Sequence, residues 1–304
     1  MVRVTAVGIC GSDVHWYDEA RIGDAAIGSP IVPGHEIAGI IETGPRAGER
    51  VVLDPAIPCG RCALCLEGRG RLCTDLRFAG MPPDEGGMQS WLAWPSARCI
   101  GLPAPVPDHE APLLEIAGIA LHAADLAGIR PGLVAGVYGS GPVGQVLVRT
   151  LRMLGVTEIV ATDRLAHRVR DALASGASRG IVVPPDGPDP AASEPVDVAF
   201  ECAGDDTAVD TAIRAVRPGG DVLLVGIPTG DTTRFTASVA RRKELRIVNV
   251  RRMEDGDLAR AAALAGSGAL RLDGLVTDRY PLEAAATAFE TASARTGMKV
   301  IVEP

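Results

Sequence analysis

The sequence predicts an α/β protein of two domains, a β-rich domain followed by a doubly wound parallel sheet. Three observations support this fold class. The first hundred or so residues are short apolar runs broken by glycine and proline, the middle of the chain alternates strand-like with helix-like segments, and a Gly-x-Gly-x-x-Gly turn lies near the start of that alternation. At 304 residues, the chain is long enough for two hydrophobic cores.

The predicted elements follow from the apolar pattern. In the N-terminal region, 37–42 and 50–53 are apolar runs bounded by Gly-Pro and Asp-Pro turns, as a barrel-like β domain requires. From about residue 118, strands alternate with helical patterns, which implies a parallel sheet joined by right-handed crossovers. The strands there are 133–138, 158–161, 181–183, 198–200, 222–225 and 247–250, with a helix at 143–154. The tail predicts a strand at 276–280, a helix at 282–292 and a last strand at 299–302.

Composition and charge restrict the class of protein. The formal net charge is -8, whereas proteins that bind nucleic acid normally present a basic face. The first residues lack the segments of a signal peptide, and no apolar run approaches the length of about eighteen residues that indicates a membrane span. Seven cysteines in such a chain suit metal-bound thiols in a reducing compartment. We therefore expect a soluble cytoplasmic protein with neither nucleic acid nor membrane as its partner.

Four closely spaced cysteines are the most informative motif, at Cys59, Cys62, Cys65 and Cys73. Two overlapping Cys-x-x-Cys motifs place three thiols around one turn, and the fourth cysteine follows shortly afterwards in the sequence. Four thiolates leave no coordination position open, which indicates a structural zinc site. A disulfide framework is the alternative, but the rest of the chain has no cystine-rich stretch.

The glycine-rich turn has the context of a dinucleotide site. Gly139 would make the tight turn, Gly141 would let a pyrophosphate approach, and Gly144 would let helix and strand pack closely. Asp163 ends the next strand, nineteen residues after Gly144. A carboxylate there accepts hydrogen bonds from the ribose 2′-OH, which favours NAD over NADP, although the adjacent Arg164 could serve a 2′-phosphate. The alternative is an ordinary glycine-rich turn with a surface aspartate.

A second set of metal donors lies upstream of the four cysteines. Cys10, His35 and Glu36 supply a thiolate, an imidazole and a carboxylate. Such a set binds zinc with one position left open, where a substrate hydroxyl can bind and ionise. Individually, Cys10 could be a small buried hydrophobe and His35 a core histidine. The nicotinamide site predicted in the same chain makes a catalytic metal the stronger interpretation.

These motifs together resemble the zinc-dependent medium-chain dehydrogenases, and within them the sorbitol and xylitol (polyol) dehydrogenases, along essentially the whole chain. The segments that carry the resemblance are 10–15, 33–36, the four-cysteine stretch, 78–84, 114–115, 120–123 and 276–282. The resemblance implies a GroES-like catalytic domain, a Rossmann domain and two zinc ions per subunit. The implied domains are 1–117, with a structural-zinc lobe at 58–74, then 118–256 for NAD binding, and 257–304 as a return to the catalytic domain.

The resemblance also implies the roles of individual residues. Cys10, His35 and Glu36 would hold the catalytic zinc, with a water or the substrate hydroxyl completing it; whether Glu36 binds directly or through water stays open. Simple alcohol dehydrogenases usually have a cysteine ligand where this chain has Glu115. A glutamate there is similar to the polyol branch, in which it holds the water or substrate at the zinc.

Further residues match positions around the substrate and the cofactor. Ser12 fits the hydroxyl that hydrogen-bonds the substrate alkoxide, and His15 the outer end of a proton relay through the nicotinamide ribose. Trp16 and Phe78 fit walls of the substrate pocket, with core packing as the alternative. The implied cofactor-binding residues are Gly139, Gly141, Val143, Gly144, Asp163, Arg168, Val225, Gly226, Ile227, Asn249, Val250 and Arg251.

Two departures from the family pattern affect the prediction. Family members usually carry a further segment before the stretch that matches residues 1–8. We expect either a start codon assigned too late or a catalytic domain with unprotected sheet edges. Arg251 corresponds to an arginine that contacts the polyol, and Arg252 replaces a tyrosine that is frequent in sorbitol dehydrogenases. Arg252 would permit an acidic or phosphorylated substrate; the alternative for both arginines is a solvated charge pair.

We therefore expect an oxidoreductase that transfers a hydride from a secondary alcohol, such as sorbitol or xylitol, to NAD. The resemblance implies a homodimer or homotetramer. The closest alternative is an L-threonine 3-dehydrogenase, in which Arg251 or Arg252 would bind the amino acid's carboxylate. A zinc- and NAD-binding protein without turnover is an alternative of another class. The acidic charge disfavours a third, a zinc-finger-like nucleic-acid binder.

Overall fold

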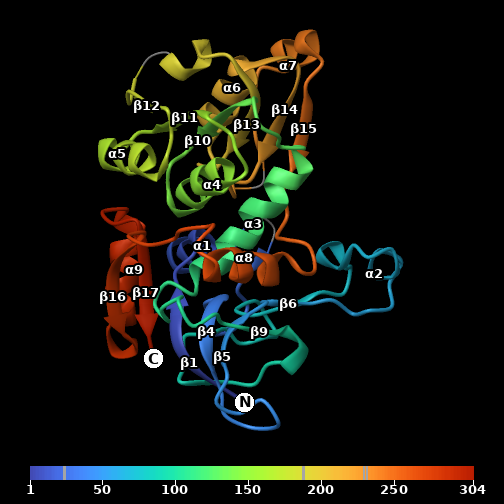
Figure 1. Cartoon of the computed structure of the whole chain (residues 1–304), viewed down its shortest axis with the longest axis vertical. Helices are drawn as coiled ribbons and strands as arrows, with labels where there is room; N and C mark the ends of the chain where they lie inside the picture. Colours follow the sequence, from blue (N-terminus) through green and yellow to red (C-terminus); the bar gives the residue numbers. More distant parts are fainter. Residues whose placement is uncertain (23–24, 187–188, 229, 231) are drawn as a thin grey trace. The chain divides into compact units, whose positions relative to one another are not determined.

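The computed structural model of the chain describes residues 1–22, 25–186, 189–228, 230 and 232–304. It divides into two compact units, each built around its own sheet (Figure 1). The first unit comprises Met1–Ile119 and Arg252–Pro304, and the second comprises Ala120–Arg251. Helix α3 (Leu113–Leu126) carries the chain from the first unit into the second. The predicted fold class, a β-rich domain together with a doubly wound parallel sheet, is confirmed.

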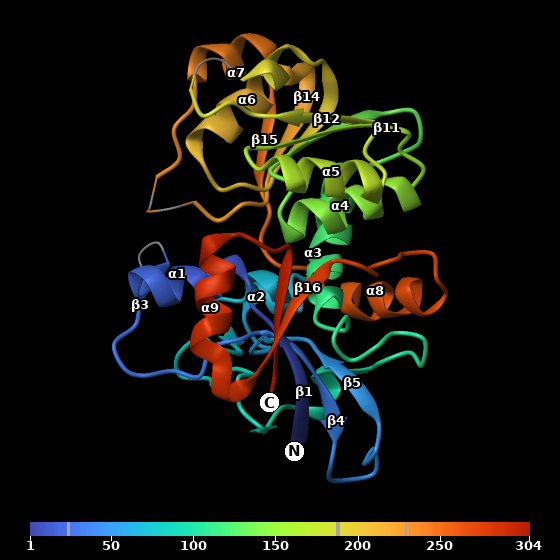
Figure 2. The same ribbon diagram turned by 90° about the vertical axis from the view of Figure 1, so that its left-hand side faces the viewer.

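The first unit is built on a sheet with the strand order β16-β17-β1-β4-β5-β9, in which β8 also pairs with β1 (Figure 2). Val2 and Val4 of β1 are buried and Arg3 between them is exposed, the alternation of a strand with one covered face. Because β17 pairs with β1, residues near both ends of the chain share one core. The strands are β1 Val2–Gly8, β4 Glu36–Ile41, β5 Arg50–Leu53, β8 Trp91–Leu92, β9 Cys99–Gly101, β16 Val276–Pro281 and β17 Lys299–Glu303.

Helices and short strands lie around this sheet, and the loops between them carry polar side chains of the unit. Helix α1 (Gly11–Glu19) begins directly after β1 and ends at Ala20, whose left-handed conformation stops the helix. Between β5 and β8 lie the short elements of the four-cysteine lobe, which we define as residues 58–74. The remaining elements of this unit are β2 Arg21–Ile22, β3 Ala25–Ala26, β6 Ala56–Ile57, α2 Ala63–Leu66, η1 Gly70–Leu72, β7 Arg77–Phe78, η2 Ser96–Arg98, α8 Asp257–Gly266, η4 Leu282–Ala284 and α9 Ala285–Ala294.

The second unit is a parallel sheet with the strand order β12-β11-β10-β13-β14-β15. The chain moves outward in one direction from β10 and then in the other direction from β13. In sheets of this kind, ligands bind outside the carboxyl ends of the strands at that reversal. The strands are β10 Val134–Tyr138, β11 Glu158–Asp163, β12 Arg179–Val182, β13 Val196–Glu201, β14 Val216–Leu224 and β15 Arg246–Asn249.

Helices cover both faces of this parallel sheet, with α4 and α5 on one face and α6 and α7 on the other (Figure 2). Helix α4 begins with Pro142, a residue suited to the first helical position. Its apolar stripe, which includes Val146, Leu147 and Leu151, is buried against the sheet, while Arg152 is exposed. The helices are α4 Pro142–Met153, α5 Ala166–Ser175, η3 Pro190–Ser193, α6 Asp206–Ala215 and α7 Ala237–Lys243.

Candidate active site

The predicted donors of the catalytic metal come together in the first unit. Cys10 lies between β1 and α1, His35 directly precedes β4, and Glu36 begins that strand. Because β1 and β4 are antiparallel neighbours, with Gly8 opposite Glu36, the end of one strand faces the start of the other. One donor atom of each residue lies within 4.8 Å of the others. This is close enough to share one zinc ion, whose bonds to such donors are about 2.0–2.3 Å long.

Asp13 holds these donors in place through contacts with their backbone and side chains. Its buried carboxylate accepts hydrogen bonds from the backbone N–H of Cys10, at 2.9 Å, and of Gly34, at 3.2 Å. Its Oδ1 also lies 3.6 Å from Nδ1 of His35. A carboxylate on that ring nitrogen leaves Nε2 of His35 as the metal donor, an arrangement common at metal sites.

The electrostatics of the cluster suit a cation. Burial by itself would lower the pKa of His35, but the charges of Asp13 and Cys10 raise it well above its ordinary value. Burial would raise the pKa of Asp13, but His35 and two backbone N–H groups lower it. The protein therefore favours positive charge beside these side chains, where a bound zinc ion would supply it. The donors and their surroundings fit the metal that the sequence predicts.

Lys299 is a buried partner of the metal donors that the sequence analysis did not identify. It begins β17, is 1% exposed, and forms an ion pair with Oε2 of Glu36, while Nζ also donates to the carbonyl oxygen of Ile9 at 2.9 Å. Gly8 leaves the space for this pair, because a Cβ placed there would stand 1.9 Å from Oε2 of Glu36. The other oxygen of Glu36 is buried with no hydrogen-bond partner among the described residues. Lys299 thus holds one oxygen and leaves the other for a ligand.

Glu115, on α3, adds a further carboxyl group near Cys10, His35 and Glu36. It is fully buried, and its Oε2 has no hydrogen-bond partner in the described part of the chain. Burial raises the pKa of Glu115 to about 7, opposed by the charges of His35 and Lys299 and reinforced by Glu36. A buried carboxyl that titrates near neutrality, with one free oxygen, can accept or donate a proton at the reacting group.

Glu115 also lines a pocket of the first unit, together with Phe78 and Arg252. The pocket has an empty volume of about 300 Å³, part of which is open to solvent. Phe78 contacts the ring of His35, with 5.3 Å between ring centroids, and the guanidinium of Arg252 lies 4.6 Å from the centroid of the same ring. Of the predicted substrate residues, Phe78 is therefore next to a metal donor, and Arg252 is next to Phe78. The other lining residues are Asp54, Pro55, Ala56, Pro58, Gly70, Arg71, Met253 and Asp255.

The remaining predicted residues of the first unit lie on α1. Ser12, His15 and Trp16 are all half-buried, and Ser12 and His15 are one helical turn apart, on the same side of the helix. Nδ1 of His15 lies 3.1 Å from a carboxylate oxygen of Glu19. This contact leaves the other ring nitrogen of His15 for a different partner.

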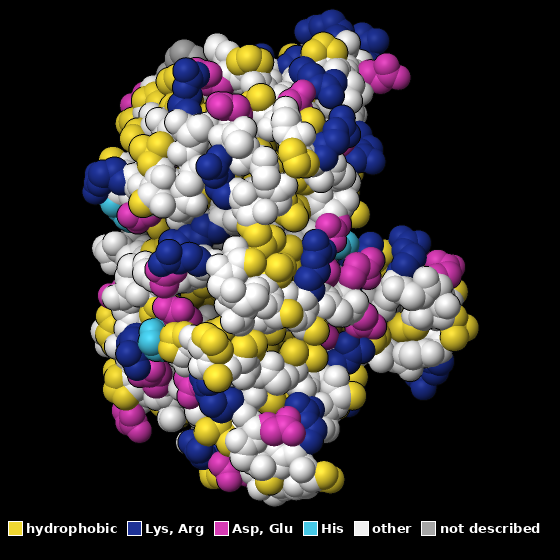
Figure 3. Space-filling view, viewed as in Figure 1, with side chains coloured by type: hydrophobic (Ala, Val, Ile, Leu, Met, Phe, Trp, Pro, Cys, Tyr) yellow, Lys and Arg dark blue, Asp and Glu magenta, His cyan; other side chains and the backbone are white. Residues whose placement is uncertain are grey.

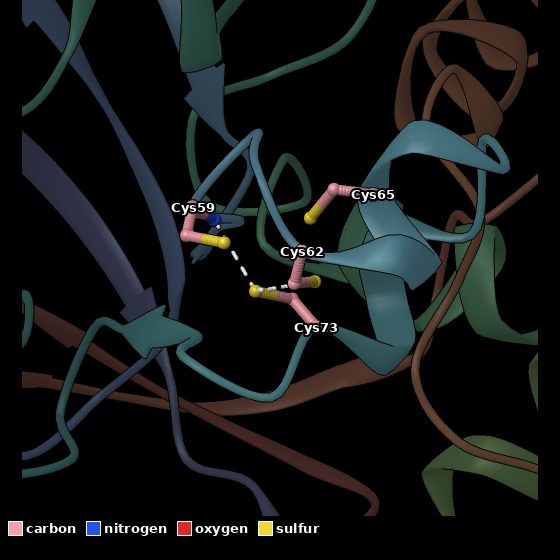
Figure 4. Close-up of side chains that lie close together, drawn as sticks. All are labelled: Cys59, Cys62, Cys65 and Cys73. Atoms are coloured by element: carbon pink, nitrogen blue, oxygen red, sulfur yellow. Dashed lines mark hydrogen bonds between the residues drawn. The ribbon is translucent and has the colours of Figure 1, made fainter.

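The four cysteines of the lobe converge on one point (Figure 4). Cys65 lies in α2, Cys59 and Cys62 precede that helix, and Cys73 follows η1. The Sγ atoms of Cys59, Cys62, Cys65 and Cys73 lie within 4.8 Å of one another, and the seven cysteines of the chain, all described, are free thiols. Backbone N–H groups of Cys59 and Asp75 donate to Sγ of Cys73, at 3.2 and 3.3 Å. Hydrogen bonds from other backbone N–H groups lower the pKa of Cys62 to about 6. Such bonds favour thiolates, the form that binds zinc.

The glycine-rich turn of the second unit has the close contacts that its sequence predicts. Gly139, at φ +102°, follows β10, and a Cβ there would stand 2.6 Å from the backbone nitrogen of Ala203. A Cβ on Gly144 would stand 2.1 Å from the carbonyl oxygen of Gly139, so a side chain would separate helix from strand. At Gly141, the nearest atom to such a Cβ is Nη1 of Arg168, at 3.3 Å. The protein itself leaves Gly141 accessible, as an approaching pyrophosphate requires.

Asp163 lies at the end of β11, directly beside this turn. Its carboxylate accepts hydrogen bonds from the backbone N–H of Ser140 and of Leu165, both at 2.9 Å. Gln145 donates to the carbonyl oxygen of Arg168 at 2.9 Å, which fixes the start of α5 against α4. The structure thus brings Asp163 and Arg168 to the edge of the predicted phosphate site. Arg164 instead has Asp205 as its charge partner, at 3.9 Å.

The predicted residues after β14 and β15 lie at the carboxyl end of the same sheet. Val225 and Gly226 both donate their backbone N–H to the carbonyl oxygen of Glu201, at 2.8 and 2.9 Å. Val143, Ile227, Asn249, Val250 and Arg251 are half-buried or exposed at this end of the unit. The side chain of Glu201, which the sequence analysis did not identify, accepts hydrogen bonds from Ala203 and Gly204 and shapes this loop.

Sequence reasoning missed several polar residues that shape the two sites. Asp13, Lys299 and Glu201 are at most 1% exposed. Asp13 and Lys299 contact residues that are distant in the sequence, and Glu201 holds the backbone of a neighbouring loop. A signal was present for Lys299 and Glu201, because each adjoins or ends an apolar strand where a charged residue is unexpected. Arg71, which lies between two of the four cysteines and lines the pocket, had no such signal.

Two further observations concern partners. No helix in the described residues is long and apolar enough to cross a membrane. On the face of the molecule shown in Figure 3, Lys and Arg side chains are interspersed with Asp and Glu. The described side chains of that face therefore do not form the continuous basic surface that nucleic-acid binding uses.

Comparisons with known proteins agree with this arrangement. Residues 1–104 match the family model of the alcohol dehydrogenase GroES-like domain, and residues 142–267 match that of zinc-binding dehydrogenases. A probable D-xylulose reductase A of Arthroderma otae is 33% identical, over 99% of this chain and 89% of that protein. A sorbitol dehydrogenase of Bacillus subtilis is 32% identical, over 96% of this chain and 86% of that protein. The crystal structure of L-idonate 5-dehydrogenase from Escherichia coli superposes with a TM-score of 0.92 and 28% identity, over 100% of this chain and 90% of that one.

Proposed function

Since this chain belongs to the zinc-dependent medium-chain dehydrogenases, which use zinc and a nicotinamide cofactor, we propose that it oxidises a secondary alcohol of a polyol to the ketone and transfers the hydride to NAD. The observation that carries the proposal is the cluster of Cys10, His35 and Glu36 with the free buried oxygen of Glu115 beside it. Such a set combines three metal donors with a group that can bind the reacting hydroxyl. The relatives named for sorbitol and D-xylulose favour a polyol substrate.

Each residue has a distinct task in this mechanism. Cys10, His35 and Glu36 would hold the zinc, which when bound withdraws electron density from the substrate oxygen and so favours loss of its proton. Asp13 keeps His35 in the orientation and tautomer that leave Nε2 free. Lys299 keeps Glu36 at the edge of the site and neutralises part of its charge.

Ser12 and Glu115 act on the substrate in this scheme. The hydroxyl of Ser12 would accept the proton of the alcohol, and His15, one helical turn further along α1, would receive it. Glu115, whose pKa is raised to about 7 by burial, would hold the reacting hydroxyl in place. A bound nicotinamide cofactor would supply the hydride acceptor, so the protein contributes orientation and charge rather than redox chemistry of its own.

The choice of NAD, the number of zinc ions and the assembly belong to the same proposal. NAD is favoured over NADP because Asp163 places a carboxylate beside the phosphate turn, where it would repel a 2′-phosphate. Two zinc ions per subunit are proposed because two separate donor clusters are present. A homodimer or homotetramer rests on the family resemblance alone. Metal analysis and light scattering of the purified protein would test the last two points.

The first experiment is a turnover assay. Zinc-loaded protein is mixed with NAD and a panel of sorbitol, xylitol, other polyols, L-threonine and simple secondary alcohols, and the NADH formed is followed by absorbance. We expect a rate on polyols that a chelator abolishes and zinc restores. Turnover of L-threonine alone would assign the chain to the other activity. Silence on the whole panel, with zinc and NAD both bound, would contradict the proposal.

A further inference from the structure

The four-cysteine lobe buries very little of its own chain. Among residues 58–74, all of which the structure describes, only Gly70 and Cys73 are buried. Figure 1 shows the lobe, marked by α2, standing out from the sheet of the first unit. A segment of this kind gains its fixed structure from a bound metal when it has the donors for one.

The lobe contacts a short segment at the point where the chain re-enters the first unit. We call this segment, residues 252–255, the return segment. Arg71 of the lobe forms an ion pair with Glu254. A Cβ on Gly70 would stand 3.4 Å from Oδ2 of Asp255. Gly70 is therefore buried at the place where the lobe and the return segment meet.

The ion pair between Arg71 and Glu254 is largely shielded from water. The side chain of Arg71 is 13% exposed and that of Glu254 is 36% exposed. The second carboxylate oxygen of Glu254 is buried and has no hydrogen-bond partner among the described residues. Without Arg71, this carboxylate would be partly buried and would lack a cation, so the return segment would have to move for water to reach it.

The return segment and the lobe together form much of the wall of the pocket that contains Glu115. Met253 also packs against α3, since a Cβ on Gly118 would stand 2.3 Å from its Sδ. Gly118 lies one helical turn after Glu115, on the same side of the helix. The lining residues that these two segments contribute are Arg252, Met253 and Asp255 of the return segment, and Pro58, Gly70 and Arg71 of the lobe.

Arg71 is tied to the predicted metal donors through the chain itself. It lies in η1, and Cys73 is the residue that ends this helix. The backbone N–H groups of Cys59 and Asp75 both donate to Sγ of Cys73. A metal bound at this thiol would hold η1, and with it Arg71, in one position.

A second contact holds the return segment without the lobe. Arg98, from η2, donates to both Asp54 and Asp255, at 2.8 Å each. This contact fixes the end of the return segment at Asp255 to the rest of the first unit. The lobe therefore governs a limited part of the segment, at Glu254 and the adjoining Met253.

We propose, on the basis of the dehydrogenase function above, that Arg71 is a positioning residue for the alcohol site, which transmits the state of the four-cysteine lobe to the return segment. Metal in the lobe fixes Arg71, and Arg71 fixes Glu254 and the pocket wall beside Glu115. The lobe thereby sets how tightly the alcohol binds, although its cysteines take no part in the reaction.

The kinetic test replaces Arg71 by methionine, which keeps the length of the side chain and removes its charge. We expect the KM of the zinc-loaded enzyme for sorbitol or xylitol to rise by about tenfold, the result if the pocket wall is in place about a tenth of the time. The kcat should change little, because saturating alcohol selects the ordered wall. The KM for NAD should stay the same, and Arg71→Lys should restore part of the affinity for the alcohol.

Glu254→Gln removes the other partner of the ion pair and provides a second variant should Arg71→Met fail to fold. It should raise the KM for the alcohol by a similar factor. The double variant should be no worse than either single variant, because the two side chains act through one contact.

Hydrogen–deuterium exchange tests the link to the metal without any turnover. The Cys10→Ser background lacks a donor of the other cluster, so added zinc acts through the lobe. In this background, zinc should slow exchange of the lobe and also of the peptide 250–257, which contains the amide that Glu254 donates to Asp257 at 2.8 Å. With Arg71→Met added, zinc should still slow exchange of the lobe but no longer that of the peptide.

Arg61→Met is the matched control for Arg71→Met. Arg61 also lies between two cysteines of the lobe, but it is 81% exposed and pairs with Asp75 at 2.9 Å. This variant should leave the KM for the alcohol and the exchange of the peptide unchanged. The inference is overturned if Arg71→Met lowers only the melting temperature, if it raises the KM for NAD as much as that for the alcohol, or if zinc slows the peptide equally with and without Arg71.

The two kinds of measurement separate this inference from the proposed function. If no compound is oxidised, but zinc slows exchange of the peptide only when Arg71 is present, the dehydrogenase proposal fails and the link between the lobe and the return segment stands. If sorbitol or xylitol is oxidised with the same KM by the wild type and by Arg71→Met, the link is refuted and the dehydrogenase stands.

Discussion

At the scale of single residues, the ion pair between Lys299 and Glu36 is the most consequential contact that the structure adds to the candidate metal site. Both side chains are almost completely buried, at 1% and 0% exposure. Charges removed from water in this way are stable only with close partners. Glu36 would have two such partners, the ammonium group of Lys299 and the metal ion.

Replacing Lys299 by methionine tests this dual partnership. Removing one member of a buried ion pair typically costs about 3–5 kcal/mol, because the other charge is left without compensation. We expect a loss of that order in the free energy of unfolding of chelator-treated Lys299→Met, and a smaller loss in the zinc-loaded variant, in which the metal compensates Glu36. Chemical denaturation with and without zinc measures both.

Arg279→Met provides the control for this variant, since Arg279 pairs with Glu303 on the neighbouring strand but is 52% exposed. An exposed pair of this kind contributes about 0–1 kcal/mol. A stability loss in Lys299→Met that did not depend on zinc would contradict the role of Glu36 as a metal donor.

Asp163 is the residue on which the preference for NAD depends. Asp163→Ala removes the carboxylate that would bind the ribose hydroxyls and repel a 2′-phosphate. We expect the ratio of kcat/KM for NAD to that for NADP to fall by about tenfold or more, the effect of losing one charged hydrogen bond. The carboxylate also accepts from Ser140 and Leu165, so the melting temperature is measured in parallel. An unchanged ratio in a stable variant would refute this assignment of Asp163.

At the scale of elements, the two cysteine-containing sites differ in which interactions stabilise their local fold. The lobe of residues 58–74 consists of very short elements, and three of its four cysteines are only half-buried. It has little apolar surface with which to fix its own fold, so a metal would do so. Cys10, in contrast, lies two residues after the end of β1, whose pairing with β4 and β17 is independent of any metal.

This difference gives opposite outcomes for two equivalent substitutions. Cys10→Ser should abolish turnover and leave the melting temperature nearly unchanged, because the strands around it keep their core. Cys62→Ser should lower the melting temperature or cause aggregation, because metal binding there supplies folding free energy. Thermal denaturation and zinc content of both variants provide the measurements. Equal losses of stability would contradict the distinction between a catalytic and a structural site.

At the scale of the whole molecule, stability should depend on pH through a residue of the second unit. Burial raises the pKa of Glu201 to about 7, although the N–H groups of Gly204 and Ala203 oppose the shift. In the unfolded chain this carboxyl has an ordinary pKa near 4.5. The folded protein therefore holds a proton that the unfolded chain has lost, and its stability falls as the pH rises from about 4.5 to about 7.

Glu201→Gln should remove the share of this dependence that Glu201 contributes, while Glu115, whose pKa burial also raises to about 7, keeps its own. At about 1.4 kcal/mol for each unit of pKa, the contribution of Glu201 to the loss of stability is up to about 3.5 kcal/mol. Calorimetry of the wild type and the variant between pH 5 and pH 8, without nicotinamide cofactor, would show it as a difference in slope. Parallel curves for the two proteins would mean that Glu201 is not the group responsible.

How much of this molecule is predictable from sequence depends on the range of the interactions. Val146, Leu147 and Leu151 follow the period of a helix, so α4 was predicted to within a residue or so at each end. The helix α1, which carries Ser12 and His15, was not predicted, because its apolar pattern is weak and its charged residues are close together. The helix α3, which carries Glu115, has an almost continuous apolar sequence, and such a run shows no distinct helical period.

The sequence by itself determined the features that depend on local spacing. These are the fold class, the four-cysteine lobe and the glycine-rich turn with Asp163, which rest on local patterns of residue types. The donor set of Cys10, His35 and Glu36 stays a prediction from residue types and the family resemblance, because Cys10 and His35 are 25 residues apart. Only the tertiary structure decided that Lys299 pairs with Glu36, that Asp13 lies behind His35, and that Arg252 lies over Phe78. These contacts join segments brought together by strand pairing and by the return of the chain to the first unit. Their geometry follows from long-range packing, which local sequence patterns do not encode.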